Sequence, residues 1–503
     1  MRDFHVAGRR RRVALGAAAL LSAMGISVLP PAPFAAGQEP AAKITRAEFA
    51  SAYLRFETIM RDAKLAGADE VRANREFDAL TILFFTGNNR EAVRRLDALA
   101  ESIAADKLGD VRSESVWMRL RLDPPVFVRG SGVPRLSIDR FYDPPSVPDG
   151  MMTTLRLAPK SPPGPIDIPL ELAFEADGSI RRIAPLELPL RDAPPGRYDV
   201  GLAVGPHHFP VGSWSVVSRP LAPRAAANTV RLDKIKPTSP ALVQSWNAVK
   251  ARNGLLTDNP DPANTTRMLI DPEALAVQVE AEIADLEKGA NPFRNRSGDY
   301  WRVVRAGDRE IPMRVYDPFP AGPTAPSALV IAFHGAGGDE NMFMDGYGAG
   351  AIKRLAEQGK FLLATPLTDA FRGDETGPAF DALLAALGAD YAIDPKRIFV
   401  LGHSAGGMLT NRLLTLRGDR IAAAACLCGF LGFPDGARGI PRTLVVAGEI
   451  DPIAAPARIT PLFEKAREAG QPVEFRLIKN YGHTLTVARI LPDVIDWLLG
   501  PAR

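Results

Sequence analysis

The sequence predicts an α/β fold for residues 297–503, in which a mostly parallel sheet is covered by helices on both faces. Short apolar runs fit buried strands at 327–333, 361–365, 397–401, 422–428, 443–447 and 473–478. Segments with helical patterns separate these runs, as expected where consecutive strands are parallel. A glycine-rich pentapeptide, Gly402-His-Ser-Ala-Gly406, joins one of these strands to a helix.

Two further strands are expected at the start of this region, before the parallel ones. Residues 299–305 and 311–316 are rich in β-branched and aromatic side chains, and Gly307-Asp308 lies between them. Such a pair of runs around a short glycine turn predicts an antiparallel hairpin.

Three segments are expected between the N-terminus and this α/β region. Residues 41–112 have helical spacing of apolar residues, and nothing in them suggests chemistry. Residues 115–219 alternate in short runs between prolines and glycines, which predicts a small β-sandwich of immunoglobulin-like type. Residues 220–296 are expected to form a linker with helices, with a proline- and alanine-rich joint at 220–227.

The N-terminus is typical of a signal peptide over residues 1–37. Arg9–Arg12 precede an apolar run at 13–29, and small residues follow at Ala35-Ala36-Gly37. The run is slightly short for a membrane span of about 20 residues. We therefore expect an exported protein, periplasmic or extracellular, without stable membrane insertion after cleavage; an uncleaved signal anchor is the alternative.

The charge balance argues against nucleic acid as a partner. The formal net charge is +3, but residues 1–37 carry five arginines and one aspartate, so the remainder is close to −1. A nearly neutral protein has no electrostatic attraction to nucleic acid or to an anionic membrane.

The pentapeptide at 402–406 has the pattern of a nucleophile elbow. It follows the strand at 397–401 and precedes a helix from Met408 to Leu416, which is the context that this motif requires. Its turn is strained, so glycine is needed at 402 and 406, and Ser404 is presented at the carboxyl end of the sheet. Ser404 is the candidate nucleophile.

A serine nucleophile needs a base and an acid that orients the base, and in this fold they follow in the order Ser, Asp or Glu, His. Asp451 stands just after the strand at 443–447 and is the candidate acid, with Glu449 as its competitor. His483, in a loop after the strand at 473–478, is the only histidine beyond Ser404 and the candidate base.

A second glycine-rich turn supplies the candidate oxyanion hole. His334-Gly-Ala-Gly-Gly338 directly follows the strand at 327–333. The backbone N–H groups of Ala336 and Ala405 are the expected donors to a developing oxyanion. His334 is interpreted as a packing or turn residue, and His403 is expected to pack beneath the elbow.

These motifs resemble those of a known superfamily. The run from Tyr391 to Gly407 is similar to that of secreted α/β-hydrolase esterases of the polyhydroxyalkanoate-depolymerase and feruloyl-esterase group. It also resembles dienelactone hydrolases and the catalytic domains of prolyl-oligopeptidase-like peptidases. The resemblance covers about two-fifths of the chain, and it implies an α/β-hydrolase fold with the triad Ser404, Asp451 and His483.

No cofactor or metal is expected. The only cysteines, Cys426 and Cys428, lie two apart in an apolar strand, and we interpret both as small buried core residues. Few other histidines or cysteines are available to complete a metal site.

The sequence therefore predicts an exported serine hydrolase that cleaves carboxylic esters of a small-molecule or polymeric substrate through an acyl-enzyme. Two alternatives remain: a peptidase of prolyl-oligopeptidase type, and a polymer-binding protein with a passenger hydrolase domain. The connection at 430–442 is too short for a large lid, so an open site is expected unless other segments cover it. The sequence does not indicate an oligomeric state.

Overall fold

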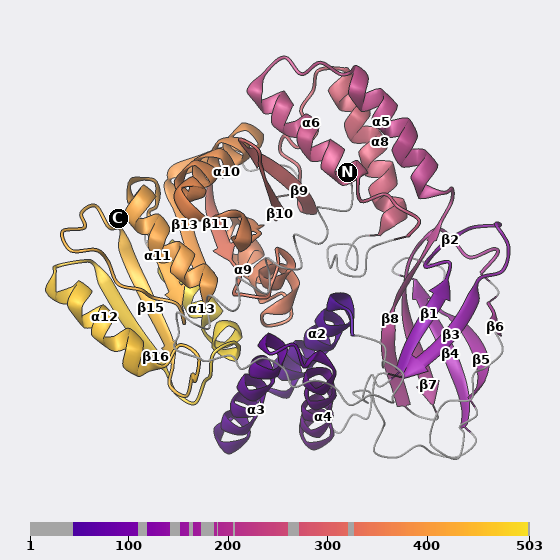
Figure 1. The fold of residues 1–503 in the computed structure, drawn as a ribbon, viewed down its shortest axis with the longest axis horizontal. Helices are drawn as coiled ribbons and strands as arrows, with labels where there is room; N and C mark the ends of the chain where they lie inside the picture. The colour runs from indigo at the N-terminus through magenta and orange to yellow at the C-terminus, as the bar shows by residue number, and fades with distance from the viewer. Residues whose placement is uncertain are drawn as a thin grey trace, which may run out of the picture. The chain divides into compact units, whose positions relative to one another are not determined.

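A computed structural model (Figure 1) gives the structure of most of the chain. It describes residues 44–108, 118–140, 151–159, 164–172, 186–188, 190–204, 207–259, 271–319 and 326–500. The segment expected to be a signal peptide lies outside these residues. The chain divides into two compact units, which are described separately: Leu65–Gly87 with Phe293–Arg503, and Gln38–Lys64 with Asn88–Pro292.

The first unit contains an eight-stranded sheet in the order β16-β15-β14-β13-β11-β12-β10-β9. The strands are β9 (Gly298–Ala306), β10 (Arg309–Asp317), β11 (Ser327–Phe333), β12 (Phe361–Pro366), β13 (Ile393–His403), β14 (Ala423–Leu427), β15 (Arg442–Gly448) and β16 (Val473–Ile478). The six strands from β11 to β16 pair in parallel, and β9 and β10 form the expected antiparallel hairpin. The mostly parallel sheet is therefore confirmed, with an antiparallel extension at one edge.

Helices pack on both faces of this sheet. They are α9 (Ala351–Gly359), α10 (Thr376–Asp390), α11 (Ala405–Arg417), α12 (Pro456–Glu468) and α13 (Leu485–Leu499). Apolar residues of α9 and α13 share one core with Val330 and Leu401, while α12 packs with Cys426 on the opposite face. Both faces are apolar because parallel strands are buried on both sides.

The chain crosses over inside the sheet, and this crossing positions the candidate site. It runs from β11 to β12 and then returns to β13 on the other side of β11. The loops after β11 and β13 therefore emerge side by side at the carboxyl edge, where open α/β sheets place their ligands. Phe333 pairs with Gly402, which brings the turn at 334–338 next to the elbow.

The first unit also includes a helix from far upstream, α3 (Gly67–Phe85). Short helical turns complete the unit at η2 (Met342–Gly346), η3 (Thr368–Ala370), η4 (Gly373–Glu375) and η5 (Gly418–Arg420). The prediction of one helical segment over residues 41–112 did not separate α3 from the helices before and after it.

The second unit contains helices α2 (Arg46–Ala63) and α4 (Asn89–Lys107) and two sheets. One sheet has the order β1-β3-β6 and the other β2-β8-β7-β4-β5. The strands are β1 (Met118–Asp123), β2 (Val126–Val128), β3 (Arg135–Arg140), β4 (Met151–Pro159), β5 (Ile166–Leu172), β6 (Leu186–Glu187), β7 (Gly196–Val204) and β8 (His207–Val217). The immunoglobulin-like class of these sheets stays a prediction.

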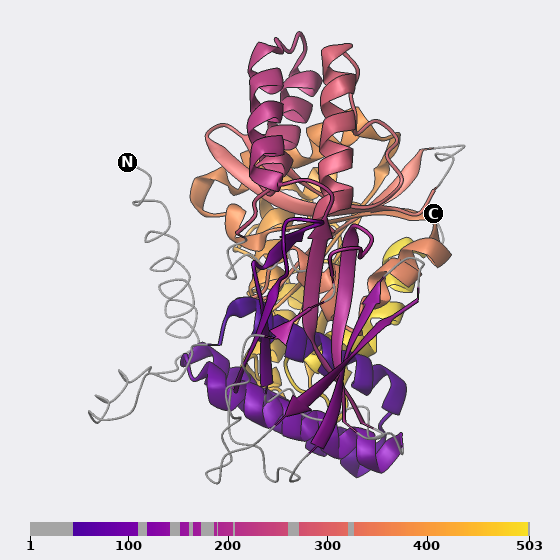
Figure 2. The ribbon, with the colours of Figure 1, turned by 90° about the vertical axis from the view of Figure 1, so that its right-hand side faces the viewer.

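Three helices follow the sheets in the same unit and lie side by side in Figure 1 and Figure 2: α5 (Leu221–Lys234), α6 (Pro240–Asn253) and α8 (Pro272–Glu287). The expectation of a joint at 220–227 is wrong, because α5 begins at Leu221. Proline is tolerated in the first turn of a helix and alanine strongly favours helix, so this composition is compatible with a helix start.

Among the described residues, no helix combines the length and the apolar character needed to cross a membrane.

Candidate active site

The elbow at Ser404 has the strained backbone that its sequence predicts. Strand β13 ends at His403, α11 begins at Ala405, and Ser404 between them has φ 54° and ψ −116°. A non-glycine residue in this region is costly and persists only where its surroundings hold it. Here the N–H of Ser404 donates to the carbonyl of Leu427 on the neighbouring strand at 2.8 Å.

Both elbow glycines are required by close approach of the backbone. A Cβ at Gly402 would lie 2.1 Å from the carbonyl oxygen of Gly406, and a Cβ at Gly406 would lie 2.0 Å from that of Phe333. The backbone of helix α11 therefore approaches the ends of β11 and β13 closely at these two glycines. No side chain fits at either position without moving the backbone.

Gly406→Ala is therefore expected to lower the free energy of unfolding by more than about 3 kcal/mol, since the overlap is with backbone rather than with a flexible side chain. Gly388→Ala is the matched control: Gly388 is exposed in α10, and a Cβ there meets nothing within 4 Å. It should stabilise the protein by up to about 1 kcal/mol. Chemical denaturation of both variants tests the pair, and equal stability of the two would contradict the packing argument.

The structure brings His483 and Asp451 together. Nδ1 of His483 lies 2.8 Å from Oδ2 of Asp451, and each residue is 3% exposed. The other oxygen of Asp451, Oδ1, accepts the N–H groups of Ile453 and Ala454, both at 2.8 Å. Burial favours a higher pKa for Asp451, but the charge and hydrogen bond of His483 and these two donors outweigh it, so the pKa is lowered. The carboxylate is therefore ionised and fixes the proton of His483 on Nδ1, leaving Nε2 as an acceptor.

The competitor Glu449 is turned away from this pair. Its side chain is exposed, and its Oε2 accepts the N–H of Asn480 at 2.9 Å. Of the two acids considered from the sequence, the structure joins only Asp451 to His483.

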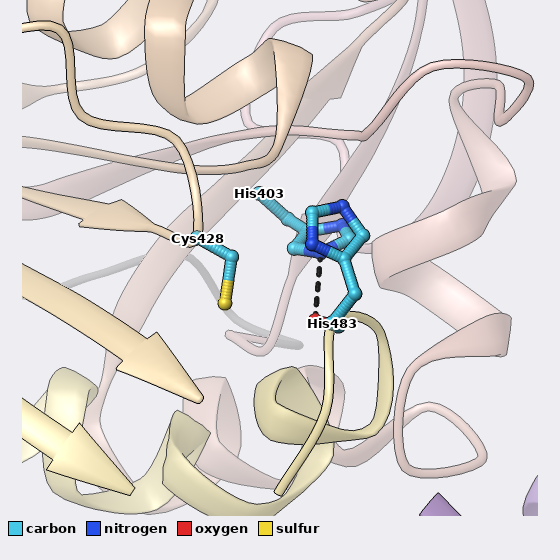
Figure 3. A group of neighbouring side chains, drawn as sticks. All are labelled: His403, Cys428 and His483. Carbon is cyan, nitrogen blue, oxygen red and sulfur yellow. Dashed lines mark hydrogen bonds between the residues drawn. The ribbon is translucent and has the colours of Figure 1, made fainter. Parts of the chain in front are cut away.

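His403 links the elbow to the His483 loop. Its Nε2 lies 3.1 Å from the carbonyl oxygen of His483, and its Nδ1 lies 2.8 Å from the hydroxyl of Tyr347 (Figure 3 shows the first bond). A carbonyl can only accept, so Nε2 of His403 carries the proton and Nδ1 accepts from Tyr347. Burial, reinforced by the neighbouring His483, lowers the pKa of His403 to about 3. His403 is thus a neutral structural bridge, which agrees with its expected packing role, and it sets the His483 loop beside the elbow.

The turn after β11 is held by His334. Its Nε2 accepts the N–H of Thr368 at 3.0 Å, and its Nδ1 donates to the carbonyl of Gly335 at 2.8 Å. Burial lowers the pKa of this imidazole, so it too stays neutral. His334 is a turn residue, as the sequence indicated.

The turn that carries Ala336 lies close to Ser404, and Ala405 directly follows this serine. A Cβ at Gly335 would come within 3.3 Å of Cβ of Ser404, so the turn lies directly against the elbow. Ala336 and Ala405 are partly exposed, and neither N–H makes a hydrogen bond to another described residue. Two such N–H groups beside a serine are the arrangement that an oxyanion hole requires.

A cluster of possible metal ligands overlaps this site. Ligand atoms of His403, Cys428 and His483 lie within 4.8 Å of one another (Figure 3). Both ring nitrogens of His403 are already hydrogen-bonded. Burial, together with the charge of Asp451, raises the pKa of the Cys428 thiol well above its usual value, whereas a metal needs the thiolate. These residues do not fit a resident metal ion.

Both cysteines are free and buried, as expected for core residues. Cys428, however, lies one residue beyond β14 with a φ of 50°, and the charge of Asp451 acts on its thiol. The sequence pattern placed it in the strand and gave no sign of this interaction.

Sequence reasoning missed the contribution of helix α3. Three of its polar residues, Glu70, Asn74 and Asp78, meet the loop at 481–483. Their spacing of four residues places them on one helix face, and this regular polar stripe was the available signal. Ser404 itself is 5% exposed, and the expectation of an open site stays a prediction.

One family model and several solved structures are similar to parts of the chain. Residues 372–433, which include the elbow, match the model of the prolyl oligopeptidase family. No curated protein matches the chain.

Several solved structures are similar to the chain at low identity. An S-formylglutathione hydrolase from Staphylococcus aureus has 16% identity and a TM-score of 0.33, over 41% of this chain and 99% of its own. A feruloyl esterase module from Clostridium thermocellum has 14% identity and a TM-score of 0.36, over 42% and 90%. An acetyl xylan esterase from Aspergillus awamori has 17% identity and a TM-score of 0.33, over 41% and 99%.

The family match spans the strand, elbow and helix that carry Ser404, and the crossed parallel sheet around them has the order described above. The sheet order and the elbow are those of an α/β-hydrolase fold, and the family match over the elbow supports a serine hydrolase.

Proposed function

We propose that the chain hydrolyses carboxylic esters through a covalent acyl-enzyme. The observation that carries the proposal is the pairing of His483 with Asp451 at 2.8 Å, in a loop bridged by His403 to the strained elbow of Ser404. An ionised acid, a base with a free Nε2 and a serine held at the same sheet edge are the parts of a Ser-His-Asp triad.

In the proposed reaction, Oγ of Ser404 attacks the ester carbonyl while Nε2 of His483 takes its proton. The N–H groups of Ala336 and Ala405 hold the negative charge that develops on the carbonyl oxygen. His483 then gives the proton to the departing alcohol, which leaves an acyl group on Ser404. A water molecule, deprotonated by the same Nε2, releases the acid and restores the serine.

A peptidase is the second candidate, and the family match over 372–433 favours it specifically. The same residues could cleave an amide, but the poorer leaving group makes greater demands on protonation and on substrate positioning. The third alternative is a polymer-binding protein in which the hydrolase domain is only a passenger. It would not explain why Asp451 and His483 are paired.

Short p-nitrophenyl esters should therefore be hydrolysed faster than proline amides. The test compares p-nitrophenyl acetate and butyrate with proline p-nitroanilides by kcat/KM, alongside labelling with a fluorophosphonate. We expect labelling and a preference of at least tenfold for the esters. Faster cleavage of the anilides would favour the peptidase, and absence of both labelling and turnover would contradict a serine hydrolase.

We also propose that the protein acts outside the cytoplasm. The support is the sequence of residues 1–37, with its arginines, apolar run and small residues before the expected cleavage point.

A further inference from the structure

Helix α3 lies against the loop that carries the proposed base, although about 400 residues of chain separate them. The N–H of His483 lies 3.0 Å from Oδ1 and 3.3 Å from Oδ2 of Asp78. One turn earlier, Oδ1 of Asn74 accepts the N–H of Gly482 at 3.0 Å. One further turn back, Glu70 faces the hydroxyl of Tyr481. Two successive turns of α3 thus hold two successive residues of the loop, and the turn before them faces a third.

This contact is closely fitted. Asn74 is 1% and Asp78 4% exposed, and the amide of Asn74 is oriented by its own bond to the carbonyl of Glu70 at 2.9 Å. A Cβ at Gly482 would lie 1.9 Å from Oδ2 of Asp78, so glycine is what allows the carboxylate to approach. Buried backbone N–H groups without an acceptor are costly, and α3 supplies acceptors for two of them.

The same helix reaches the other side of the elbow. A Cβ at Gly337, in the turn after β11, would lie 2.6 Å from Cε1 of Phe84 and 3.6 Å from Cε1 of Phe85. Helix α3 therefore contacts both loops that flank Ser404, and these two contacts fix the position of the helix beside the site.

We infer that Asp78 is a positioning residue of the proposed active site, which holds the backbone of His483 from helix α3 and places a negative charge behind the His483–Asp451 pair. This inference rests on the proposed function. The charge would stabilise the imidazolium that forms on His483 as the serine attacks, just as Asp451 does from Nδ1. The role differs from that of Asp451, because Asp78 bonds to the main chain of His483 rather than to its ring.

Such a charge is expected to favour activity at the expense of stability. Burial raises the pKa of Asp78 to about 7; the His483 N–H opposes this rise, and the charge of Asp451 adds to it. The titratable groups that face Asp78 are Asp451, His483 and the Cys428 thiol. A carboxyl whose pKa is raised in the folded protein destabilises the fold as pH rises from about 4 to 7, because the unfolded state gives up its proton first.

The test compares Asp78→Asn with Glu76→Gln, which removes one negative charge from an exposed position of the same helix. For Asp78→Asn we expect kcat for a short p-nitrophenyl ester to fall at least tenfold at pH 8 with little change in KM. Its Tm at pH 8 should equal or exceed that of the wild type. The rise of kcat/KM with pH should need two ionisations in the wild type and in Glu76→Gln, but only one in Asp78→Asn.

Other results would overturn the inference. The inference is wrong if Asp78→Asn keeps the wild-type kcat and pH profile. It is also wrong if kcat and Tm fall together while the pH profile stays unchanged, because that result indicates a merely structural role. If the variant fails to fold, hydrogen exchange of the wild-type peptide at 479–484 decides: we expect protection comparable to β15, and rapid exchange would refute the contact. An inactive, unlabelled wild type would instead refute the proposed function.

Discussion

Ser404→Ala is expected to lower kcat/KM for a short p-nitrophenyl ester by about 10⁴-fold or more. The substitution removes only Oγ, the atom proposed to attack the carbonyl. The backbone of the elbow should persist, because its φ of 54° is held by surrounding packing and by the bond from the Ser404 N–H to Leu427. Steady-state kinetics with circular dichroism of the same sample measures both effects.

The matched control is Ser137→Ala, at an exposed position of β3 in the other unit, which should keep wild-type activity and fluorophosphonate labelling. A Ser404→Ala protein that retains more than a tenth of the wild-type rate, or that is still labelled, would show that the nucleophile is a different residue.

Asp451→Asn is expected to cost about 10⁴-fold in kcat, whereas Glu449→Gln should leave activity within twofold of the wild type. Oδ1 of Asp451 accepts two backbone N–H groups, so in the variant this position must remain the amide oxygen. The amide NH₂ then faces Nδ1 of His483, which has to become an acceptor. The ring proton moves to Nε2, which can no longer take the proton of Ser404.

Glu449→Gln keeps an oxygen for the N–H of Asn480 and removes the same charge from an exposed position two residues away. Both variants are assayed on one short ester, with thermal denaturation to compare stability. If Glu449→Gln were inactive and Asp451→Asn active, the acid would be Glu449, which would contradict the hydrogen bond between Asp451 and His483.

The sequence was sufficient for those parts of the site that local rules specify. The pentapeptide at 402–406 implied a strained turn, and the structure gives Ser404 the required backbone, with no space for a side chain at either glycine. The alternation of apolar runs predicted the parallel sheet, because strands buried on both faces have a distinctive composition. Chain order and strand ends then led to Asp451 and His483, since the carboxyl ends of parallel strands share one edge.

The choice between Asp451 and Glu449 as the acid required the three-dimensional structure. The two are separated by a single residue, Ile450, and either could follow the strand, but only one turns its carboxylate to His483. The bridging role of His403 likewise depends on the placement of Tyr347 and of the His483 carbonyl. Neither partner is close to His403 in the sequence.

The partners of helix α3 could not be predicted from the sequence. Composition and periodicity identified a helical segment, the fold of residues 297–503, and the order of nucleophile, acid and base. Only the tertiary structure decided that Asn74 and Asp78 meet Gly482 and His483, because a polar stripe on a helix has the same spacing whether it faces water or a buried loop. What an amphipathic helix packs against depends on contacts about 400 residues away, and no local pattern encodes such a contact.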